Sequence, residues 1–360
     1  MILKNVNLYG TLTDITIKDG KIASISKTCE DGEDFGGLKI YPGLIDTHCH
    51  GCLGYDASDK EDHLAEMSRY QLMHGITTWY PTTITVSLSD IEDAVSRNTE
   101  IEGGANIPGF HMEGPFINIE CKGAQNGEYV IPADIDAFNR CNKNGKVKKI
   151  TVAPECEGAL EFIEKCPVLV SIGHTKCDYT TACEAFKRGA RCLTHTFNTM
   201  PPIHHRAPGP IPAGADFDGV YAELISDGIH VHPSSVRALV KLYGEDRIIL
   251  ISDSVRALGL PDGEYDLGGL DITVKDGVAR TREGNLAGST TNLFECTKRA
   301  ISFGIPEYTA VKMASENPAR SMGLNKGKIE VGYDADLILV DAEFNLKYSM
   351  VGGKIYECDR

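Results

Sequence analysis

Residues 42–51 read Pro42-Gly43-Leu44-Ile45-Asp46-Thr47-His48-Cys49-His50-Gly51, an apolar run that ends in two histidines. Alternate residues of an extended strand face the same side, so both imidazoles project together, about 6 to 7 Å apart along the chain. One cation can accept both rings. Cys49 points to the other side, and its pairing with Cys52 lacks the second CxxC motif of a zinc site. We therefore expect both cysteines to be core residues without disulfides.

Seven further apolar, β-prone runs follow along the chain. Eight such strands alternating with helical connections predict a parallel (β/α)8 barrel of the TIM type, in which functional groups gather at the carboxyl ends of the strands. The eight runs are Leu44–Thr47, Thr77–Ile84, Ile107–Met112, Lys148–Ala153, Val168–Gly173, Cys192–Phe197, Tyr221–Ser226 and Ile248–Ser252. A doubly wound open sheet is the structural alternative, but it usually carries a glycine-rich phosphate loop, and the sequence has neither Gly-x-Gly-x-x-Gly nor a Walker motif.

Several segments between the runs carry helix signals. Ser58 with Glu61, and Ser89 with Glu92, form capping-box patterns that predict helix starts. An apolar stripe at helical spacing ends at Gly244, which predicts a helix stop; its members are Val236, Leu239, Val240 and Tyr243.

Both ends of the chain alternate in short, strand-like pieces that are too few to be stable alone. The pieces are Ile2–Leu8, Thr13–Ile17, Lys21–Ser26, Asp336–Val340, Asn345–Met350 and Gly353–Glu357. We expect the two ends to meet in one small β-sandwich domain. The predicted division is residues 1–41 and 324–360 for this domain, and residues 42–323 for the barrel.

Composition narrows the function. The 360 residues carry a formal net charge of -15, which argues against nucleic-acid binding because such proteins need basic patches for the phosphates. No apolar run reaches membrane-spanning length, and the start of the sequence shows no secretion signal. These features predict a cytoplasmic enzyme without membrane partners. An anionic substrate would need a local group of cations to overcome the acidic background.

Four further residues of metal-ligand type end predicted strands: Glu113, His174, His195 and Asp253. Each alone has an ordinary explanation, such as a surface ion pair, a core histidine or a helix cap. Together with His48 and His50 they become a cluster if the strands share one barrel, which predicts a metallohydrolase. In this interpretation Asp253 takes a proton from metal-bound water and later delivers it to the leaving amine, with hydroxide as the nucleophile.

The sequence resembles the N-acetylglucosamine-6-phosphate deacetylases of the amidohydrolase superfamily along essentially its whole length. The matching motifs are Pro42–Gly51, His111–Phe116, Gly173–Thr175, Thr194–Met200, Ser252–Asp253 and Leu286–Ser289. The resemblance implies hydrolysis of N-acetyl-D-glucosamine 6-phosphate to glucosamine 6-phosphate and acetate. It implies that Glu113, His174 and His195 hold the principal divalent metal and that Asp253 is the general base and acid.

The resemblance also bears on a second metal. Some members of the family lack the histidine pair after the first strand and work with one metal, whereas this sequence keeps His48 and His50. One or two metals per subunit are therefore expected, with Glu113 as the bridge in the second case. Zinc is the first choice, and iron, manganese and cobalt suit the same ligands. We expect His174 and His195 to be neutral, each with its other ring nitrogen held by an acceptor.

Substrate contacts are implied in the same way for Asn198, Thr199, Arg206 and His230. Arg206 offers a permanently charged fork to the sugar phosphate. In the family, Arg206 and His230 can act across a subunit boundary, which implies a homodimer. One departure is Gln125, which stands where many relatives have a substrate-binding histidine; its amide can still bond a hydroxyl, but the preferred epimer is open.

Three alternatives remain open from the sequence. The nearest is the same reaction on N-acetylgalactosamine 6-phosphate. A cyclic amide hydrolase or base deaminase of the same superfamily is more distant, because it leaves Arg206 without a role. A non-catalytic binding protein is the third, although such relatives usually lose metal ligands.

Overall fold

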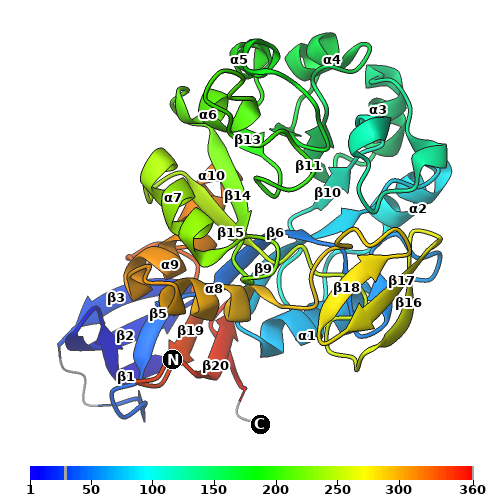
Figure 1. The fold of residues 1–360 in the computed structure, drawn as a ribbon. Coiled ribbons are helices and arrows are strands. Elements are labelled where there is room, and N and C mark those ends of the chain that lie inside the picture. Colours follow the sequence, from blue (N-terminus) through cyan, green and yellow to red (C-terminus); the bar gives the residue numbers. More distant parts are fainter. Residues whose placement is uncertain (28–30, 359–360) are drawn as a thin grey trace.

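The computed structural model describes residues 1–27 and 31–358, and its centre is a sheet of eight parallel strands (Figure 1). The strands are β6 (Leu44–Cys49), β9 (Ile76–Thr83), β10 (Phe110–Glu113), β11 (Val147–Val152), β12 (Leu169–Ile172), β13 (Cys192–Leu193), β14 (Tyr221–Ile225) and β15 (Ile248–Ile251). Neighbours in space follow the order of the sequence from β6 to β15. All eight predicted runs are confirmed as strands.

The first and last strands meet and nearly close the barrel. The Asp253 backbone N–H donates to the His48 carbonyl at 2.9 Å. The carboxylate of buried Asp46 accepts from the backbone N–H of His48 and of Ser252. Every residue of β6, β9 and β15 is buried, as expected for parallel strands covered on both faces. The predicted barrel is therefore confirmed.

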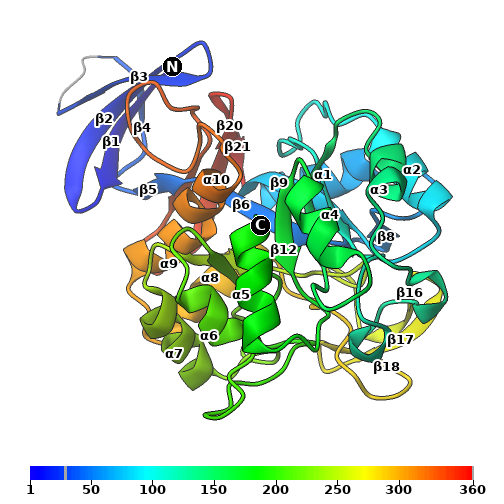
Figure 2. The ribbon, with the colours of Figure 1, turned by 90° about the horizontal axis from the view of Figure 1, so that it is seen from above.

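Helices cover the outside of the barrel (Figure 2). They are α1 (Leu64–Met73), α2 (Leu88–Ser96), α3 (Ile135–Cys141), α4 (Ala159–Lys165), α5 (Tyr179–Arg188), α6 (Pro210–Ala215), α7 (Pro233–Tyr243), α8 (Leu293–Ser302), α9 (Glu307–Ala314) and α10 (Glu316–Ser321), with the 3-10 turns Ile119–Cys121 and Gly127–Tyr129. The predicted stripe is confirmed in α7, which ends before Gly244.

Both predicted helix starts were wrong. The α1 helix begins at Leu64, and the Ser58 hydroxyl accepts instead from the backbone N–H of Ile84. The α2 helix is capped by Ser87, two residues before the predicted Ser89. The α1 helix follows His63 without a side-chain cap, whereas the Ser87 hydroxyl caps α2, so a hydroxyl at capping-box spacing does not by itself start a helix.

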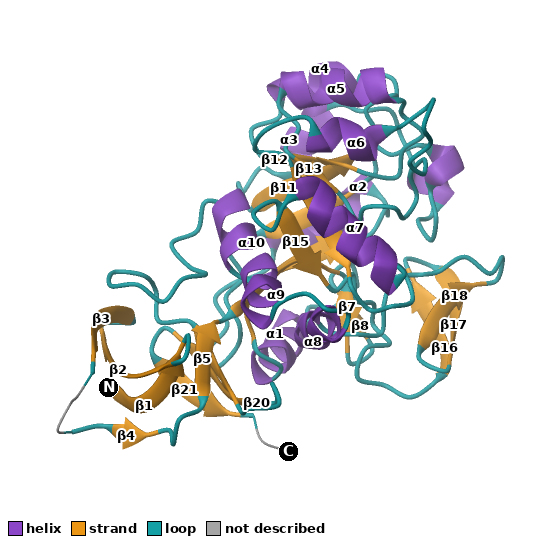
Figure 3. Cartoon of the chain, turned by 60° about the vertical axis from the view of Figure 1, so that its left-hand side comes forward, coloured by secondary structure: helices purple, strands orange, loops and turns teal. Residues whose placement is uncertain are grey.

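Strands from both ends of the chain form a second sheet, in the order β21-β20-β19-β5-β1-β2-β3 (Figure 3). Its members are β1 (Ile2–Leu8), β2 (Thr11–Lys18), β3 (Lys21–Ser26), β4 (Glu33–Asp34, paired with β1), β5 (Lys39–Pro42), β19 (Leu337–Val340), β20 (Leu346–Val351) and β21 (Lys354–Glu357). One apolar cluster links Leu3 and Ile15 with Leu337 and Met350. The expected terminal β-domain is thus present, with its strands joined in a single hydrogen-bonded path.

A third, antiparallel sheet follows β15 and lies across the barrel from the terminal sheet (Figure 2). It consists of β16 (Gly263–Leu267), β17 (Leu270–Lys275) and β18 (Val278–Thr281), and the short pair β7 (Gly51–Cys52) and β8 (Tyr55–Asp56) follows β6. Among the described residues, none of the helices has the length and apolar character needed to cross a lipid bilayer.

Candidate metal centre and substrate pocket

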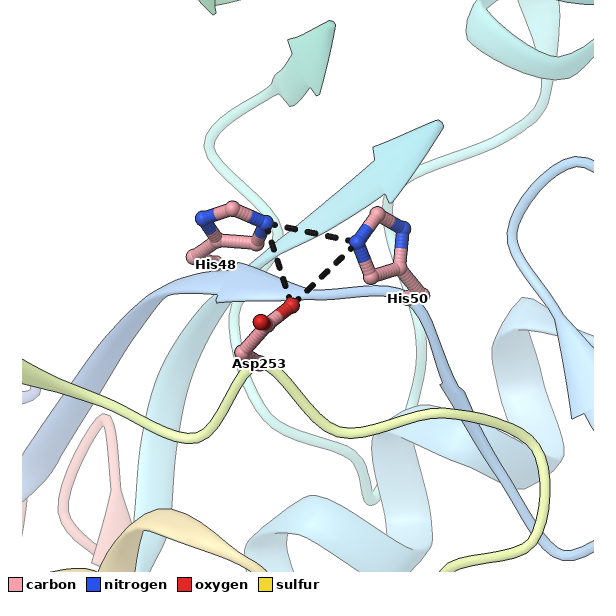
Figure 4. A group of neighbouring side chains, drawn as sticks. All are labelled: His48, His50 and Asp253. Carbon is pink, nitrogen blue, oxygen red and sulfur yellow. Dashed lines mark hydrogen bonds and ion pairs between the residues drawn. The ribbon is translucent and has the colours of Figure 1, made fainter. Parts of the chain in front are cut away.

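Six side chains of ligand type converge at the carboxyl end of the barrel in two groups. One group is His48, His50 and Asp253, and the other is Glu113, His174 and His195; all six are buried. Figure 4 shows that Asp253, on the loop after β15, lies beside His48 and His50 at the end of β6. In each group the ligand atoms lie within 4.8 Å of one another. The expected clustering of these residues is what the structure contains.

The first group is compact. His48 Nε2 and His50 Nε2 are 3.3 Å apart, and Asp253 Oδ1 lies 3.3 Å from the former and 3.4 Å from the latter (Figure 4). Cys49 points away and contacts Ser254 and Gln71, in agreement with its predicted core role. The alternation along β6 thus turns two imidazoles toward one point.

The second group is centred on Glu113. Its Oε1 lies 3.3 Å from His174 Nε2 and 3.0 Å from His195 Nε2, and these nitrogens are 3.2 Å apart. Glu113 also joins the two groups, because Oε1 is 3.3 Å from His48 Nε2 and Oε2 is 3.2 Å from His50 Nε2. A carboxylate in this position can bridge two ions.

The backbone aims several of these side chains by an uncommon conformation. His174, His195 and Asp253 have positive φ angles of 48°, 29° and 49°. Non-glycine residues rarely adopt this region, and such strain gathers at functional sites. Each residue stands two positions after the last residue of a strand, where the left-handed turn directs its side chain inward.

The donor set fits a cation. His50 and His174 direct Nδ1 to the carbonyl oxygens of Thr82 (3.0 Å) and Cys121 (2.9 Å), which leaves a lone pair on each Nε2. Lone pairs and carboxylates that crowd one point repel unless a positive charge lies between them. The predicted acceptor for His174 Nδ1 is confirmed as the Cys121 carbonyl. The prediction for His195 was wrong, because no described residue accepts from its Nδ1.

Electrostatics support ionised carboxylates here. Burial opposes ionisation, yet the charges of His48 and His174 hold the pKa of Glu113 well below its usual range. Burial is likewise outweighed at Asp253, where His48 and His50 lower the pKa to about 2. Burial alone would lower the pKa of His48, but Glu113 and Asp253 raise it to about 9. A divalent metal can supply the same positive charge in place of the ring protons, because its binding displaces them.

A pocket of about 670 Å³ opens over this centre. Five of the expected substrate or catalytic residues line it: Gln125, Asn198, Thr199, His230 and Asp253. Leu267 of β16 and Leu286 form part of its wall, so the antiparallel sheet borders the pocket. Arg206 is not among its lining residues and lies exposed beside His205.

Gln125 is already engaged by protein groups. Its Oε1 accepts from the Thr85 backbone N–H at 2.6 Å, which turns Nε2 toward Oε2 of Glu113 as a donor. The amide therefore contacts the Glu113 carboxylate and has one further N–H, and Gln125 is among the residues that line the pocket.

Sequence reasoning missed several buried charged residues near the site. Asp227 accepts from His230 Nδ1 at 2.7 Å, and Lys149 pairs with Glu223 beneath His48. Asp227 follows the seventh predicted strand as the ligands follow theirs, so the same pattern could have found it. Lys149 and Glu223 are charged residues inside otherwise buried strands, which is itself a signal.

Comparisons with known proteins agree with this geometry. The Amidohydrolase family model matches residues 40–356. The chain is 36% identical to the N-acetylglucosamine-6-phosphate deacetylase of Lysinibacillus sphaericus, over 99% of this chain and 97% of that protein. It is 32% identical to the N-acetylgalactosamine-6-phosphate deacetylase of Escherichia coli O157:H7, over 95% and 94% of the two chains.

A solved structure gives the same result. The N-acetyl-D-glucosamine-6-phosphate deacetylase of Mycobacterium smegmatis, in complex with N-acetyl-D-glucosamine-6-phosphate, superposes with a TM-score of 0.92 at 31% identity. The match covers 99% of this chain and 98% of that one. The chain therefore belongs to the amidohydrolase family, within the group formed by the N-acetylglucosamine-6-phosphate deacetylases.

Proposed function

We propose that the chain hydrolyses the amide of N-acetyl-D-glucosamine 6-phosphate, with glucosamine 6-phosphate and acetate as products. The observation that carries this is the pair of ligand groups joined by Glu113 at the floor of a pocket large enough for a sugar phosphate. The full-length similarity to deacetylases of this substrate supports it.

In the proposed site, Glu113, His174 and His195 would hold one divalent ion. His48 and His50 would hold a second, and Glu113 would contribute to both. A bound divalent ion polarises the acetyl carbonyl and lowers the pKa of water. Zinc is the proposed ion, since imidazole and carboxylate ligands suit it, with iron, manganese and cobalt as the competitors to test.

Asp253 is the proposed general base and acid. Its Oδ1 faces the histidine pair, and the carboxylate has a second oxygen to take the proton of the attacking water. The same carboxyl then gives that proton to the leaving amine, which completes amide cleavage. An aspartate carboxyl is ionised at neutral pH, as a base must be at the start of the reaction.

Recognition of the sugar phosphate is assigned to Asn198, Thr199, His230 and Gln125, which line the pocket, and to Arg206. Because Arg206 lies outside the pocket of its own chain, we assign it to the pocket of a partner subunit in a homodimer. Residues 42–323 make the proposed catalytic domain, and residues 1–41 with 324–360 the small domain. The free, buried thiols of Cys49 and Cys52 agree with the reducing cytoplasm as the proposed location.

The galacto epimer is the second candidate substrate, supported by the 32% identical N-acetylgalactosamine-6-phosphate deacetylase. The two substrates differ in one hydroxyl, which the free N–H of Gln125 could distinguish. Comparison of kcat/KM for the two epimers decides between them.

The primary test is acetate release by purified protein after chelator dialysis and re-addition of single metals. We expect metal-dependent turnover of N-acetylglucosamine 6-phosphate and little of the unphosphorylated sugar. Turnover of a phosphate-free cyclic amide instead would favour the cyclic amide hydrolase. Stoichiometric binding of the sugar phosphate without acetate release would favour a binding protein.

A further inference from the structure

A buried ion pair lies inside the barrel beneath the metal centre. Lys149 of β11 and Glu223 of β14 are 1% and 0% exposed, and Lys149 Nζ donates to Glu223 Oε1 and to the Thr47 carbonyl. Neither side chain lines the pocket, so neither can touch the substrate there. Burying two charges is costly, and an apolar pair would serve barrel packing at least as well. The pair therefore calls for a role beyond stability.

Glu223 connects this pair to the first ligand group. Its Oε1 accepts from the Thr47 hydroxyl at 2.9 Å, and its Oε2 lies 3.4 Å from His48 Nδ1. When Nδ1 of His48 donates to this carboxylate, the lone pair is on Nε2, which faces His50 and Asp253. Glu223 thus sets both the tautomer and the orientation of His48.

His48 differs in this respect from two other ligand histidines. His50 and His174 direct Nδ1 to neutral backbone carbonyls of Thr82 and Cys121. A carboxylate behind an imidazole orients the ring and makes its free nitrogen a stronger ligand. Behind His48 stands a charged group, whereas His50 and His174 rest on neutral carbonyls.

We propose that Lys149 and Glu223 are positioning residues that hold His48 as a metal ligand and so set the affinity of the His48–His50–Asp253 group for its ion. Lys149 neutralises Glu223 within the barrel, and Glu223 acts through His48. The inference rests on the proposed function only in that the site holds metal.

The variant design follows from the charges. Removal of Lys149 or Glu223 alone leaves an unpaired buried charge and can prevent folding. The double variant Lys149→Met with Glu223→Leu removes both charges and keeps apolar volume. The conservative double variant Lys149→Met with Glu223→Gln keeps an amide oxygen that can accept from His48 Nδ1. The half-buried pair Lys39–Glu307, between β5 and α9 and outside the pocket, is the matched control as Lys39→Met with Glu307→Leu.

The experiment is calorimetric titration of Zn²⁺ into metal-stripped protein, with metal content checked by mass spectrometry. We expect two equivalents in the wild-type chain, one of which disappears in His50→Ala and is thereby assigned. The Leu double variant should weaken that equivalent by about 10-fold to 100-fold and leave the other unchanged. The Gln double variant should recover much of the loss, and the control pair should bind as wild type.

Three outcomes would overturn the inference. The first is wild-type affinity for both equivalents in a folded Leu double variant. The second is equal loss of both equivalents with a lowered Tm, which would make the pair structural. The third is a wild-type chain that takes a single ion unaffected by His50→Ala. Acetate release by the wild-type protein would still stand in each case, so failure here is distinct from failure of the deacetylase proposal.

Discussion

Asp253 has two proposed functions in the site, as general base and as general acid. Asp253 is 8% exposed, follows β15 in a left-handed backbone conformation and directs Oδ1 at His48 and His50. Asn is nearly isosteric but cannot take a proton from water. The change therefore separates proton transfer from the shape of the site.

For Asp253→Asn we expect kcat to fall by about 100-fold to 10,000-fold, the usual worth of a positioned acid–base group. The ion at Glu113, His174 and His195 should remain, since Asp253 is not in that group. Steady-state kinetics with parallel metal analysis check this. A rate near wild type would remove Asp253 from the mechanism.

His230 and Asp227 form a pair whose effect depends on pH. Burial alone would lower the pKa of His230, but the hydrogen bond and charge of Asp227 raise it above its usual value. His230 therefore stays protonated to higher pH in the folded protein. Its contribution to stability is complete below the unfolded pKa and is lost as pH rises through the folded pKa. A cationic His230 at the pocket wall suits an anionic substrate.

In Asp227→Asn the amide oxygen can still accept from the backbone N–H groups of Ile229 and His230, but the negative charge is gone. The pKa of His230 should fall, so the alkaline loss of kcat/KM should begin at lower pH than in wild type. Profiles of kcat/KM against pH measure this, with His230→Gln as the variant that lacks the titrating group. Superimposable profiles of Asp227→Asn and wild type would contradict it.

At the scale of elements, β12 delivers His174 through a tightly packed glycine. A Cβ on Gly173 would lie 2.6 Å from Thr194 Cβ and 2.9 Å from Thr151 Cγ2, on the strands to either side. Such distances force side chains or backbone to move, which costs about 1–3 kcal/mol in a packed core. Because Gly173 has no side chain, the three strands can pack closely at the candidate metal centre.

Gly173→Ala should lower the free energy of unfolding by about 1–3 kcal/mol and weaken metal binding, because the displaced strand carries His174. Urea denaturation and Zn²⁺ titration measure the two effects. Gly263→Ala in β16 is the control, since its Cβ would meet nothing closer than 3.8 Å. Equal stability of both variants would show that β12 shifts without cost.

At the scale of the whole molecule, the pocket of one chain needs a further cation to bind the proposed phosphate. Lys176 lines it but is paired with Glu120, and Arg206 points from an exposed loop outside it. The overall charge of -15 makes a further cation more necessary. A second subunit that supplies Arg206 would complete the site.

Subunit mixing tests this arrangement. Arg206→Ala and Asp253→Asn are each expected to be nearly inactive, but a mixed dimer would unite the intact Asp253 of one subunit with the intact Arg206 of the other. Refolding the two variants together should recover up to about one quarter of the wild-type rate. No recovery in a confirmed mixed dimer would place Arg206 in the site of its own chain.

Much of this molecule could be read from local patterns. The eight apolar runs predicted the barrel strands because strand periodicity and burial are local properties, and the ligand types at their ends predicted the cluster because parallel strands end at one edge. The predicted helix starts at Ser58 and Ser89 were wrong, because Ser58 bonds to Ile84 instead and the neighbouring Ser87 caps α2. The prediction of an acceptor for His195 Nδ1 was also wrong, since such an acceptor would have to come from elsewhere in the fold.

The sequence by itself determined the barrel, the terminal sheet and the six clustered residues of ligand type, since each follows from periodicity and position along the chain. Only the tertiary structure decided three spatial relations: Glu223 lies beneath His48, Gln125 lies against Glu113, and Arg206 lies outside its own pocket. These relations depend on the stagger between strands and on loop paths. No local pattern of residues encodes those quantities.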